Sequence, residues 1–209
     1  MPTEHIVQQG EYLAKIAAQY GFSSYRTIWD HANNAELKRK RKNPNILYPG
    51  DKLFIPDRQP REESASTDTR HDYRLKSETL KLRLLVKGSD DEPIANTPCV
   101  LIVENRRYEK TTNAAGNVEE IIRRGAHVAS LTIRDVEIPL RIGDLDPVEE
   151  ISGQQARLNN LGYDAGPVDG SDEAKRRSAV EEFQCDHKLK VDGDCGSKTQ
   201  AKLVEVHGC

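Results

Sequence analysis

The sequence predicts a multidomain α+β protein that contains three small folded units. Apolar residues follow helical spacing at both ends of the chain and alternate with polar residues in the middle. The tripeptide Val-Asp-Gly occurs twice near the C-terminus, each time before a helix-forming stretch. Hydrophobic residues make up 36% of the 209 residues and charged residues 31%, so several modest cores fit better than one large core. We predict folded units at residues 1–57, 80–146 and 147–209, with a polar linker at 58–79.

Composition excludes several classes of function. A net charge of −3 provides no basic field for nucleic acid, and three Phe with one Trp are too few for a base-stacking platform. No apolar run approaches the roughly 20 residues that cross a bilayer. The first five residues lack the basic and apolar regions of a secretory signal, so we expect synthesis in the cytoplasm.

The first unit is predicted as strand, helix, helix, strand. His5–Val7 forms the first strand, and apolar residues recur at helical spacing from Leu13 to Tyr20, before a Gly21 cap. A second helix, capped by Ser23 or Ser24, is expected to carry Tyr25, Ile28 and Trp29. A turn at Pro49-Gly50 then leads to a closing strand at Lys52–Pro56.

This unit resembles a LysM domain. The residues that carry the resemblance are His5–Leu13, Ile16-Ala17, Tyr20-Gly21, Ile28, Asn33 or Asn34, Ile46, Pro49–Asp51 and Leu53–Pro56. LysM domains bind N-acetylglucosamine-containing glycans between two loops, so the resemblance implies peptidoglycan as partner. Acetamido groups need backbone hydrogen bonds and a small apolar contact, which Tyr12, Leu47 and Tyr48 are suited to supply. The implied glycan-binding residues are Gly10, Glu11, Tyr12, Leu13, Ile46, Leu47, Tyr48 and Pro49. In the alternative, these residues only maintain the fold and the unit binds a neighbouring protein.

The segment from Ala35 to Asn45 is longer and more basic than is usual in such domains. It contains five consecutive cations, Lys38–Lys42. Such a run is usually a solvated face or loop, and the alternative is a patch that contacts nucleic acid or wall phosphates.

Between Leu80 and Ile142 the period changes to two, which predicts a small antiparallel β-sandwich of six or seven short strands. The expected strands are Leu80–Val86, Val100–Val103, Tyr108–Thr112, Val118–Ile122, Ala129–Ile133 and Val136–Ile142. This region resembles, more loosely, transthyretin-like or carboxypeptidase-regulatory-like domains, chiefly through Asn113–Asn117. Such domains usually space or dock other parts of a protein.

Helical spacing returns after Pro147 and predicts a compact three-helix unit. This unit resembles the three-helix peptidoglycan-binding domain, through Leu161-Gly162-Tyr163 and the two Val-Asp-Gly copies above all. Glu173 and Arg176 stand where the second half has Gly196 and Thr199, and Gln154 stands at a usually apolar position, so we expect a remodelled first-half loop. The residues implied to bind peptidoglycan are Tyr163, Asp169, Gly170, Phe183, Gln184, Asp192, Gly193 and Thr199.

Three cysteines, Cys185, Cys195 and Cys209, cluster in this unit beside His187 and His207. Zinc binding is one interpretation, but about 14 helical residues would hold Cys195 and Cys209 about 20 Å apart. A Cys185–Cys195 disulfide and free thiols are the other two, and free thiols are usual in a protein made in the cytoplasm.

No metalloprotease motif, nucleophile elbow or facing pair of carboxylates is present in the sequence. The sequence therefore predicts a non-catalytic protein that binds peptidoglycan, without cofactor, metal site or membrane span. The domain order also resembles proteins of contractile injection machines such as type VI secretion systems and phage-like tails. That resemblance implies a structural or cargo-adaptor component, with a spike or effector protein as partner. A secretion or tail apparatus would then carry the chain to the periplasm or cell wall.

Overall fold

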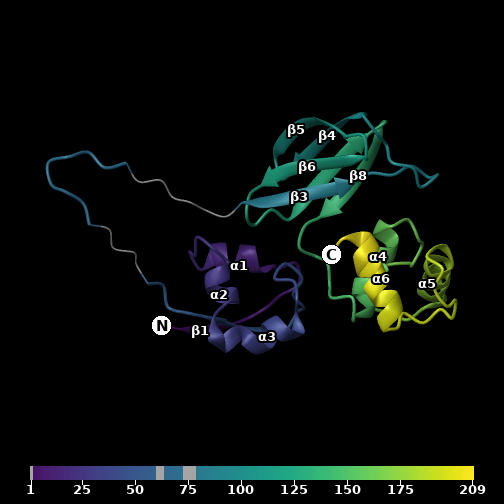
Figure 1. Ribbon diagram of the computed structural model, residues 1–209, viewed down its shortest axis with the longest axis horizontal. Coiled ribbons are helices and arrows are strands. Elements are labelled where there is room, and N and C mark those ends of the chain that lie inside the picture. The colour runs from purple at the N-terminus through teal and green to yellow at the C-terminus, as the bar shows by residue number, and fades with distance from the viewer. Residues whose placement is uncertain (1, 60–63, 73–78) are drawn as a thin grey trace.

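The computed structural model describes residues 2–59, 64–72 and 79–209. Residues 60–63 and 73–78, which belong to the predicted linker, lie outside the described residues. Figure 1 shows three folded parts, and residues 64–72 lie away from all of them. Each part encloses its own cluster of buried apolar side chains. Below, these parts are called the N-terminal, β and C-terminal domains.

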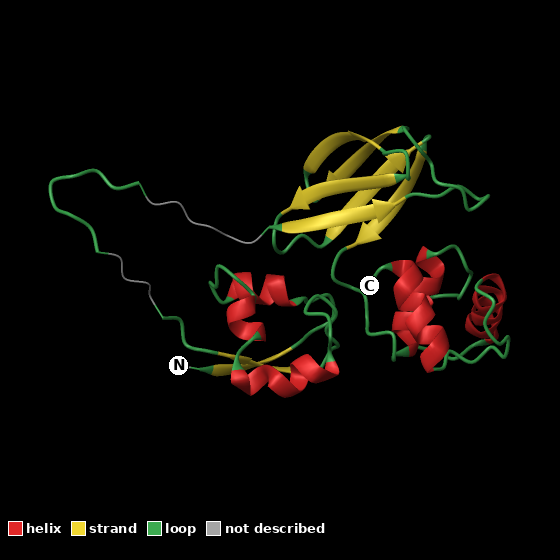
Figure 2. Ribbon diagram, viewed as in Figure 1, coloured by secondary structure: helices red, strands yellow, loops and turns green. Residues whose placement is uncertain are grey.

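The N-terminal domain packs helices against a two-stranded antiparallel sheet (Figure 2). Strand β1 (Thr3–Ile6) pairs with β2 (Lys52–Ile55). The predicted first helix is α1 (Leu13–Gln19), and Gly21 ends it at φ +75°, as expected. The second predicted helix is the short α2 (Arg26–Trp29). A 3-10 turn, η1 (Ala32–Asn34), and a further helix, α3 (Ala35–Lys40), follow it. The predicted strand-helix-helix-strand order therefore omitted α3.

Asn34 holds the helical part of this domain to its sheet. Its buried side-chain amide donates hydrogen bonds to the carbonyl oxygens of Ile28 and Phe54, both at 2.8 Å. Its side-chain oxygen accepts the Phe54 N–H at 2.8 Å. Every polar atom of the amide thus has a partner, which is the condition for burying such a group at low cost.

The β domain contains six strands in two antiparallel sheets. One sheet pairs β3 (Leu80–Leu85) with β6 (Asn117–Ile122). The other has the order β5-β4-β7-β8. Its strands are β4 (Pro98–Val103), β5 (Arg106–Thr111), β7 (Val128–Ile133) and β8 (Val136–Arg141). Both sheets contribute alternate side chains to one core, so the period of two in the sequence correctly located the six strands.

The C-terminal domain contains three helices, α4 (Ile151–Asn160), α5 (Ala174–Asp186) and α6 (Ser197–His207). Arg157 of α4 is buried and joins distant backbone segments. Its guanidinium donates to the carbonyl oxygens of Asp146 and Gly153 at 2.7 Å and to that of Cys209 at 2.9 Å. Within the described part of the chain, no helix is long and apolar enough to cross a membrane.

Candidate functional site

The two loops implied to form a glycan groove lie side by side in the N-terminal domain. The first loop, residues 10–13, joins the second, residues 46–50, through the adjoining Pro44, whose carbonyl oxygen accepts the Leu13 N–H at 3.2 Å. The Asp51 carboxylate shapes the second loop because it accepts the Tyr48 N–H at 3.0 Å. The Pro49-Gly50 turn that the sequence predicted lies in the second loop.

The candidate residues differ in their exposure. In the second loop, Ile46, Tyr48 and Pro49 are half-buried, so part of each side chain faces solvent. Leu47 is buried in the hydrophobic core. In the first loop, Gly10, Tyr12 and Leu13 are all buried. Tyr12 and Leu47 therefore do not offer the exposed apolar surface that the sequence suggested, whereas Tyr48 does.

Tyr12 is buried because the β domain covers it. Its hydroxyl donates to the Ala126 carbonyl oxygen at 2.9 Å and accepts the Gly125 N–H at 2.9 Å. Burial raises the pKa of Tyr12, so the phenol stays protonated and keeps its donor role. Nearby, the Arg124 guanidinium donates to the carbonyl oxygens of Phe22 and Ser23 at 3.0 and 2.9 Å.

Two glycines allow the N-terminal and β domains to approach this closely. Gly10 has φ +76°, and a Cβ there would lie 2.8 Å from Cε1 of His127 and 2.9 Å from Oδ1 of Asp144. Gly143 has φ +92°, and a Cβ there would overlap the Tyr12 ring. Sequence reasoning missed this contact because glycine and arginine in the β domain carry no local pattern that points to a distant loop.

Glu11, the remaining candidate in the first loop, has partners within its own domain. Its carboxylate lies 2.8 Å from Nε2 of His5 and accepts the Gln8 N–H at 2.9 Å. The other ring nitrogen of His5 lies 3.1 Å from the Tyr20 hydroxyl. Glu11 thus fixes the entry into the first loop.

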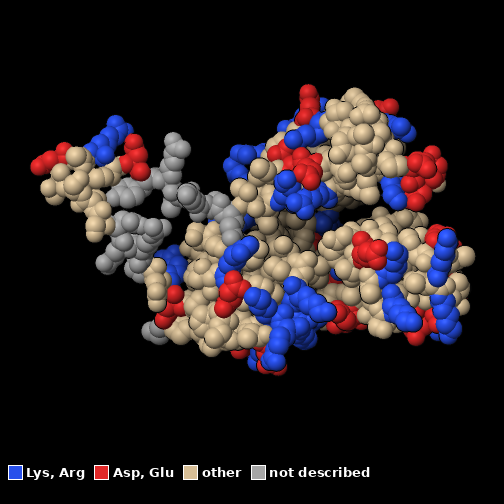
Figure 3. Space-filling view, in the orientation of Figure 1, with Lys and Arg blue, Asp and Glu red and all other residues tan. Residues whose placement is uncertain are grey.

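The basic run Lys38–Lys42 is only partly a solvated face. Figure 3 shows Lys and Arg side chains gathered over α3. Arg41, however, is buried, and its Nε and Nη2 donate to the Asp51 carboxylate at 2.8 and 3.2 Å. The Arg41 guanidinium also lies 5.5 Å from the centre of the Tyr48 ring. Arg41 therefore stabilises the second loop through Asp51, whose carboxylate also accepts the Tyr48 N–H. The other four cations of the run are exposed.

In the C-terminal domain, two buried glutamines hold the two Val-Asp-Gly loops in the same way. The Gln155 side-chain oxygen accepts the N–H groups of Asp169 and Gly170 at 3.2 and 3.0 Å, and its amide donates to Asp169 Oδ1 at 3.2 Å. Gln184 repeats these contacts with Asp192 and Gly193 at 2.9 to 3.0 Å. The repeated Val-Asp-Gly sequence therefore corresponds to a repeated structure, in which a buried glutamine accepts two N–H groups of the loop.

The eight residues implied to bind peptidoglycan in this domain divide into two groups. Phe183, Gln184, Gly193 and Thr199 are buried and maintain the fold. The remaining four have surface that a ligand can reach, namely Tyr163, which is half-buried, and Asp169, Gly170 and Asp192, which are exposed. Two residues that sequence reasoning did not select lie beside them. Val168 and Val191, the first residues of the two loops, are both about half exposed.

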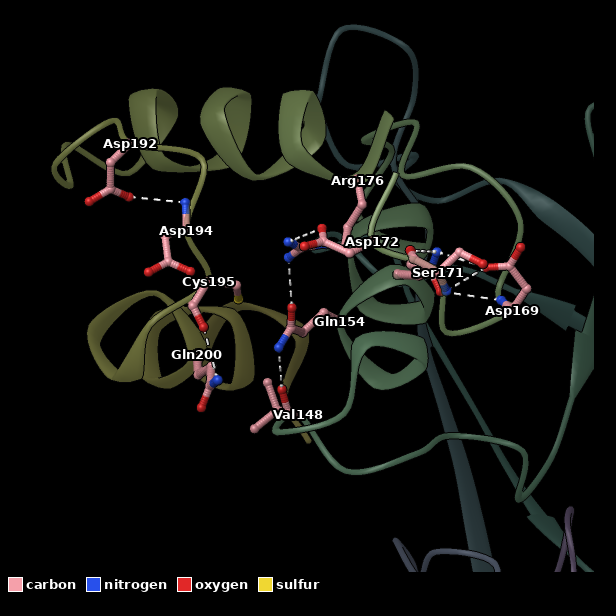
Figure 4. A network of polar contacts seen from close by, with 11 residues as sticks. Val148, Gln154, Asp169, Ser171, Asp172, Arg176, Asp192, Asp194, Cys195 and Gln200 are labelled. Carbon is pink, nitrogen blue, oxygen red and sulfur yellow. Dashed lines mark hydrogen bonds and ion pairs between the residues drawn. The ribbon is translucent and has the colours of Figure 1, made fainter. Parts of the chain in front are cut away.

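Gln154 and Arg176, two of the three unusual residues of the first half, pair with each other, as Figure 4 shows. The Arg176 guanidinium donates to the Gln154 side-chain oxygen at 2.9 Å and to Asp172 Oδ1 at 2.8 Å. The Gln154 amide in turn donates to the Val148 carbonyl oxygen at 3.0 Å. Arg176 and Gln154 are both buried, so this network forms a polar link between α4 and α5 inside the domain. It alters the interior beside the first Val-Asp-Gly loop, while Gln155 holds that loop in its usual way.

All four cysteines are free thiols. Cys185 is exposed at the end of α5, whereas Cys195 is buried, and burial raises the pKa of the Cys195 thiol to about 11. The predicted alternative of a Cys185–Cys195 disulfide is therefore not the arrangement found. Among the described residues, His, Cys, Asp and Glu side chains form no group that could hold a metal ion.

Two protein families match the ends of the chain. Residues 5–56 match the LysM domain, and residues 148–203 match the family described as "Putative peptidoglycan binding domain". No curated protein and no solved structure matches the chain. The prediction of a LysM domain and a peptidoglycan-binding domain is thus confirmed, and both are binding modules rather than catalytic ones. The N-terminal domain is called the LysM domain from here on.

Proposed function

We propose that the protein binds bacterial peptidoglycan through both terminal domains and does not cleave it. The observation that carries this proposal is the presence of two unrelated wall-binding families on one chain. The free thiols and the lack of a metal-binding group in the described residues give no competing catalytic assignment.

Purified protein mixed with insoluble peptidoglycan sacculi tests this function. We expect the protein to sediment with the sacculi and to release no soluble muropeptides. Bovine serum albumin, mixed with the same sacculi, controls for trapping. Protein that stays in the supernatant contradicts the binding function, and muropeptide release that a single carboxylate or His substitution abolishes would show a hydrolase instead.

In the LysM domain, the glycan groove is assigned to both loops, and Tyr48 of the second loop supplies its exposed contact. Its half-buried ring sits over the Arg41 guanidinium and beside Pro49, and it is positioned by the Asp51 carboxylate. A Tyr48→Ala change should weaken binding of chitopentaose about tenfold, measured by calorimetry. Tyr25→Ala, a tyrosine of the same domain outside both loops, is the control for general destabilisation. Unchanged affinity in the Tyr48 variant would contradict the assignment.

In the C-terminal domain, the contact is assigned to the exposed Val-Asp pairs at the start of the two loops. Each pair offers an apolar side chain next to a carboxylate whose pKa is held below its usual range by hydrogen bonds, from the Ser171 N–H to Asp169 and from the Gln184 amide to Asp192. A fixed anion beside an apolar contact suits the amine and methyl groups of a stem peptide.

An adaptor role in a contractile injection machine is the second candidate. The two-stranded β3–β6 sheet favours it, because both of its strands are edges and an edge strand can pair with a strand of another protein. Leu85 and Ile121 are exposed on the outer face of this sheet. Replacing both with Lys should abolish co-purification with a spike or effector protein from the native cell and leave sacculus binding intact. Point changes are preferred to deleting the β domain, since a deletion would expose Tyr12. Recovery of no such partner by the wild-type protein would contradict this role.

A further inference from the structure

We propose that the β domain masks the first glycan-binding loop of the LysM domain, so that glycan and the β domain compete for it. This inference rests on the proposed function, because it concerns the groove that we assign to glycan. It adds a regulatory contact within the chain that neither matching family contains, since the β domain lies outside both matched regions.

The first step of the argument is that Tyr12 is fully engaged by the β domain. Its hydroxyl has one proton to donate and uses it on Ala126, and it accepts a second hydrogen bond from Gly125. The ring itself is only 2% exposed. A glycan therefore cannot reach Tyr12 unless the β domain moves away.

The second step is that the contact extends along the first loop. His127 and Asp144 lie against Gly10, and Gly143 lies against the Tyr12 ring. Both glycines adopt positive φ, a conformation that side chains disfavour, and both allow an approach that a Cβ would prevent. Only half of the groove is covered, since Tyr48 and Ile46 in the second loop keep exposed surface.

The third step is that the chain permits the two domains to separate. Strand β2 ends at Ile55 and β3 begins at Leu80. Two dozen residues therefore connect them, and an extended chain of that length spans roughly 80 Å. Opening the contact breaks no covalent restraint, and its cost is confined to the hydrogen bonds and packing described above.

Because only open molecules bind glycan through both loops, the apparent affinity equals the affinity of the open form multiplied by the fraction of molecules that are open. If one molecule in ten is open, the affinity falls tenfold. The four hydrogen bonds across the contact make a closed majority the expected state. Variants that open the contact should therefore bind glycan more tightly than the wild-type protein.

Gly143→Ala is the most direct test, because the added methyl group would overlap the Tyr12 ring without altering the LysM domain. Gly162→Ala is its matched control, because Gly162 has φ +95° and open space around its Cβ position. Both glycines have nearly the same φ, +92° and +95°, so a difference between the two variants reports the overlap with Tyr12. Arg124→Ala is a second opening variant, which removes the donor to Phe22 and Ser23.

Each full-length variant is titrated with chitopentaose by calorimetry, and its fold is checked by circular dichroism. We expect Gly143→Ala and Arg124→Ala to bind chitopentaose at least about tenfold more tightly than the wild type does. Gly162→Ala should bind it with the wild-type affinity. In the wild type, saturating glycan should shift the NMR signal of the Gly125 amide, because its hydrogen bond to Tyr12 is lost.

The possible outcomes separate the masking from the proposed function. Equal affinity in the wild type and both opening variants, with an unmoved Gly125 signal, overturns the masking and leaves glycan binding in place. Absence of chitopentaose binding in every variant removes glycan binding by the LysM domain, and the masking with it.

Discussion

At the scale of single residues, two buried glutamines explain why Val-Asp-Gly recurs. Gln184 satisfies the backbone of one loop with both ends of its amide, and Gln155 does the same in the other. The two cases differ in solvent access. Gly193 is buried, whereas Gly170 is exposed, so water can replace Gln155 as acceptor of the Gly170 N–H more readily than it can replace Gln184 as acceptor of the Gly193 N–H.

Replacing Gln184 with Met should therefore destabilise the C-terminal domain by about 3 kcal/mol, because a buried N–H loses its acceptor. Gln155→Met should cost about half as much. Hydrogen exchange of the Leu203 amide, in the core of α6, measures the free energy of opening of this domain. Equal losses in both variants would show that burial of the loop backbone does not decide the cost.

Cysteine reactivity gives a second prediction at this scale. With a pKa of about 11, the Cys195 thiol is ionised in about one molecule in a thousand at pH 8, and it is also buried. Burial raises the pKa of Cys99 and Cys209 as well. Iodoacetamide should therefore label exposed Cys185 first and half-buried Cys209 more slowly, and mass spectrometry of the peptides should show Cys99 and Cys195 labelled only after urea is added. Rapid labelling of Cys195 in the native protein would contradict the buried thiol.

At the scale of elements, the basic segment shows how one buried ion pair places a helix. The side chains of Arg41 and Asp51 are both about 5% exposed, and their pairing ties the end of α3 to the turn before β2. Burial works against the charged carboxylate, but hydrogen bonds from Arg41 and from the Tyr48 N–H outweigh it, so the pKa of Asp51 is lowered.

The sign of the pH dependence follows from this lowered pKa. Stability from the ion pair is present above the unfolded-state pKa of about 4 and is lost as pH falls through the lower folded-state value. Asp51→Asn should cost the LysM domain about 3 kcal/mol at pH 7, because Arg41 stays buried without its partner. The difference from the wild type should shrink below pH 4. Fluorescence of Trp29, the single tryptophan, follows urea unfolding of this domain. A difference that is constant with pH would contradict the role of Asp51.

The helices and strands could largely be predicted from the sequence, whereas the contacts between residues far apart in the sequence could not. Hydrophobic period located the six strands of the β domain and the three C-terminal helices, because each buries one face. The helix α3 was missed, since its run of cations has no apolar period. It buries a single apolar side chain, Leu37, and the pair of Arg41 with Asp51 holds its end. Tyr12 was assigned to glycan from a local motif, but its burial depends on Ala126, more than a hundred positions away.

At the scale of the whole molecule, the protein has a LysM domain and a peptidoglycan-binding domain that differ in accessibility. The β domain covers the first loop of the LysM domain at Tyr12. In the LysM domain, Gly10 and Tyr12 of the first loop are buried, whereas the loop around Tyr48 keeps exposed surface. In the C-terminal domain, both loops are exposed at Val168 and Val191. The C-terminal domain is therefore expected to contact peptidoglycan first. Glycan can then reach the LysM domain at high effective concentration, because both domains belong to one chain.

Linked binding makes a prediction about combined changes. Val168→Ser with Val191→Ser should weaken sacculus binding about a hundredfold, because the LysM domain alone must displace the β domain to bind. Tyr48→Ala should weaken sacculus binding only about tenfold, because the C-terminal domain still binds the wall.

Adding Gly143→Ala to the two valine changes should raise the affinity about tenfold again, since the LysM groove is then open. Sedimentation over a range of sacculus concentrations measures all of these affinities, with Gly162→Ala in place of Gly143→Ala as the control. If the valine changes leave binding intact, the C-terminal loops are not the first contact, and the order of binding inferred from exposure is wrong.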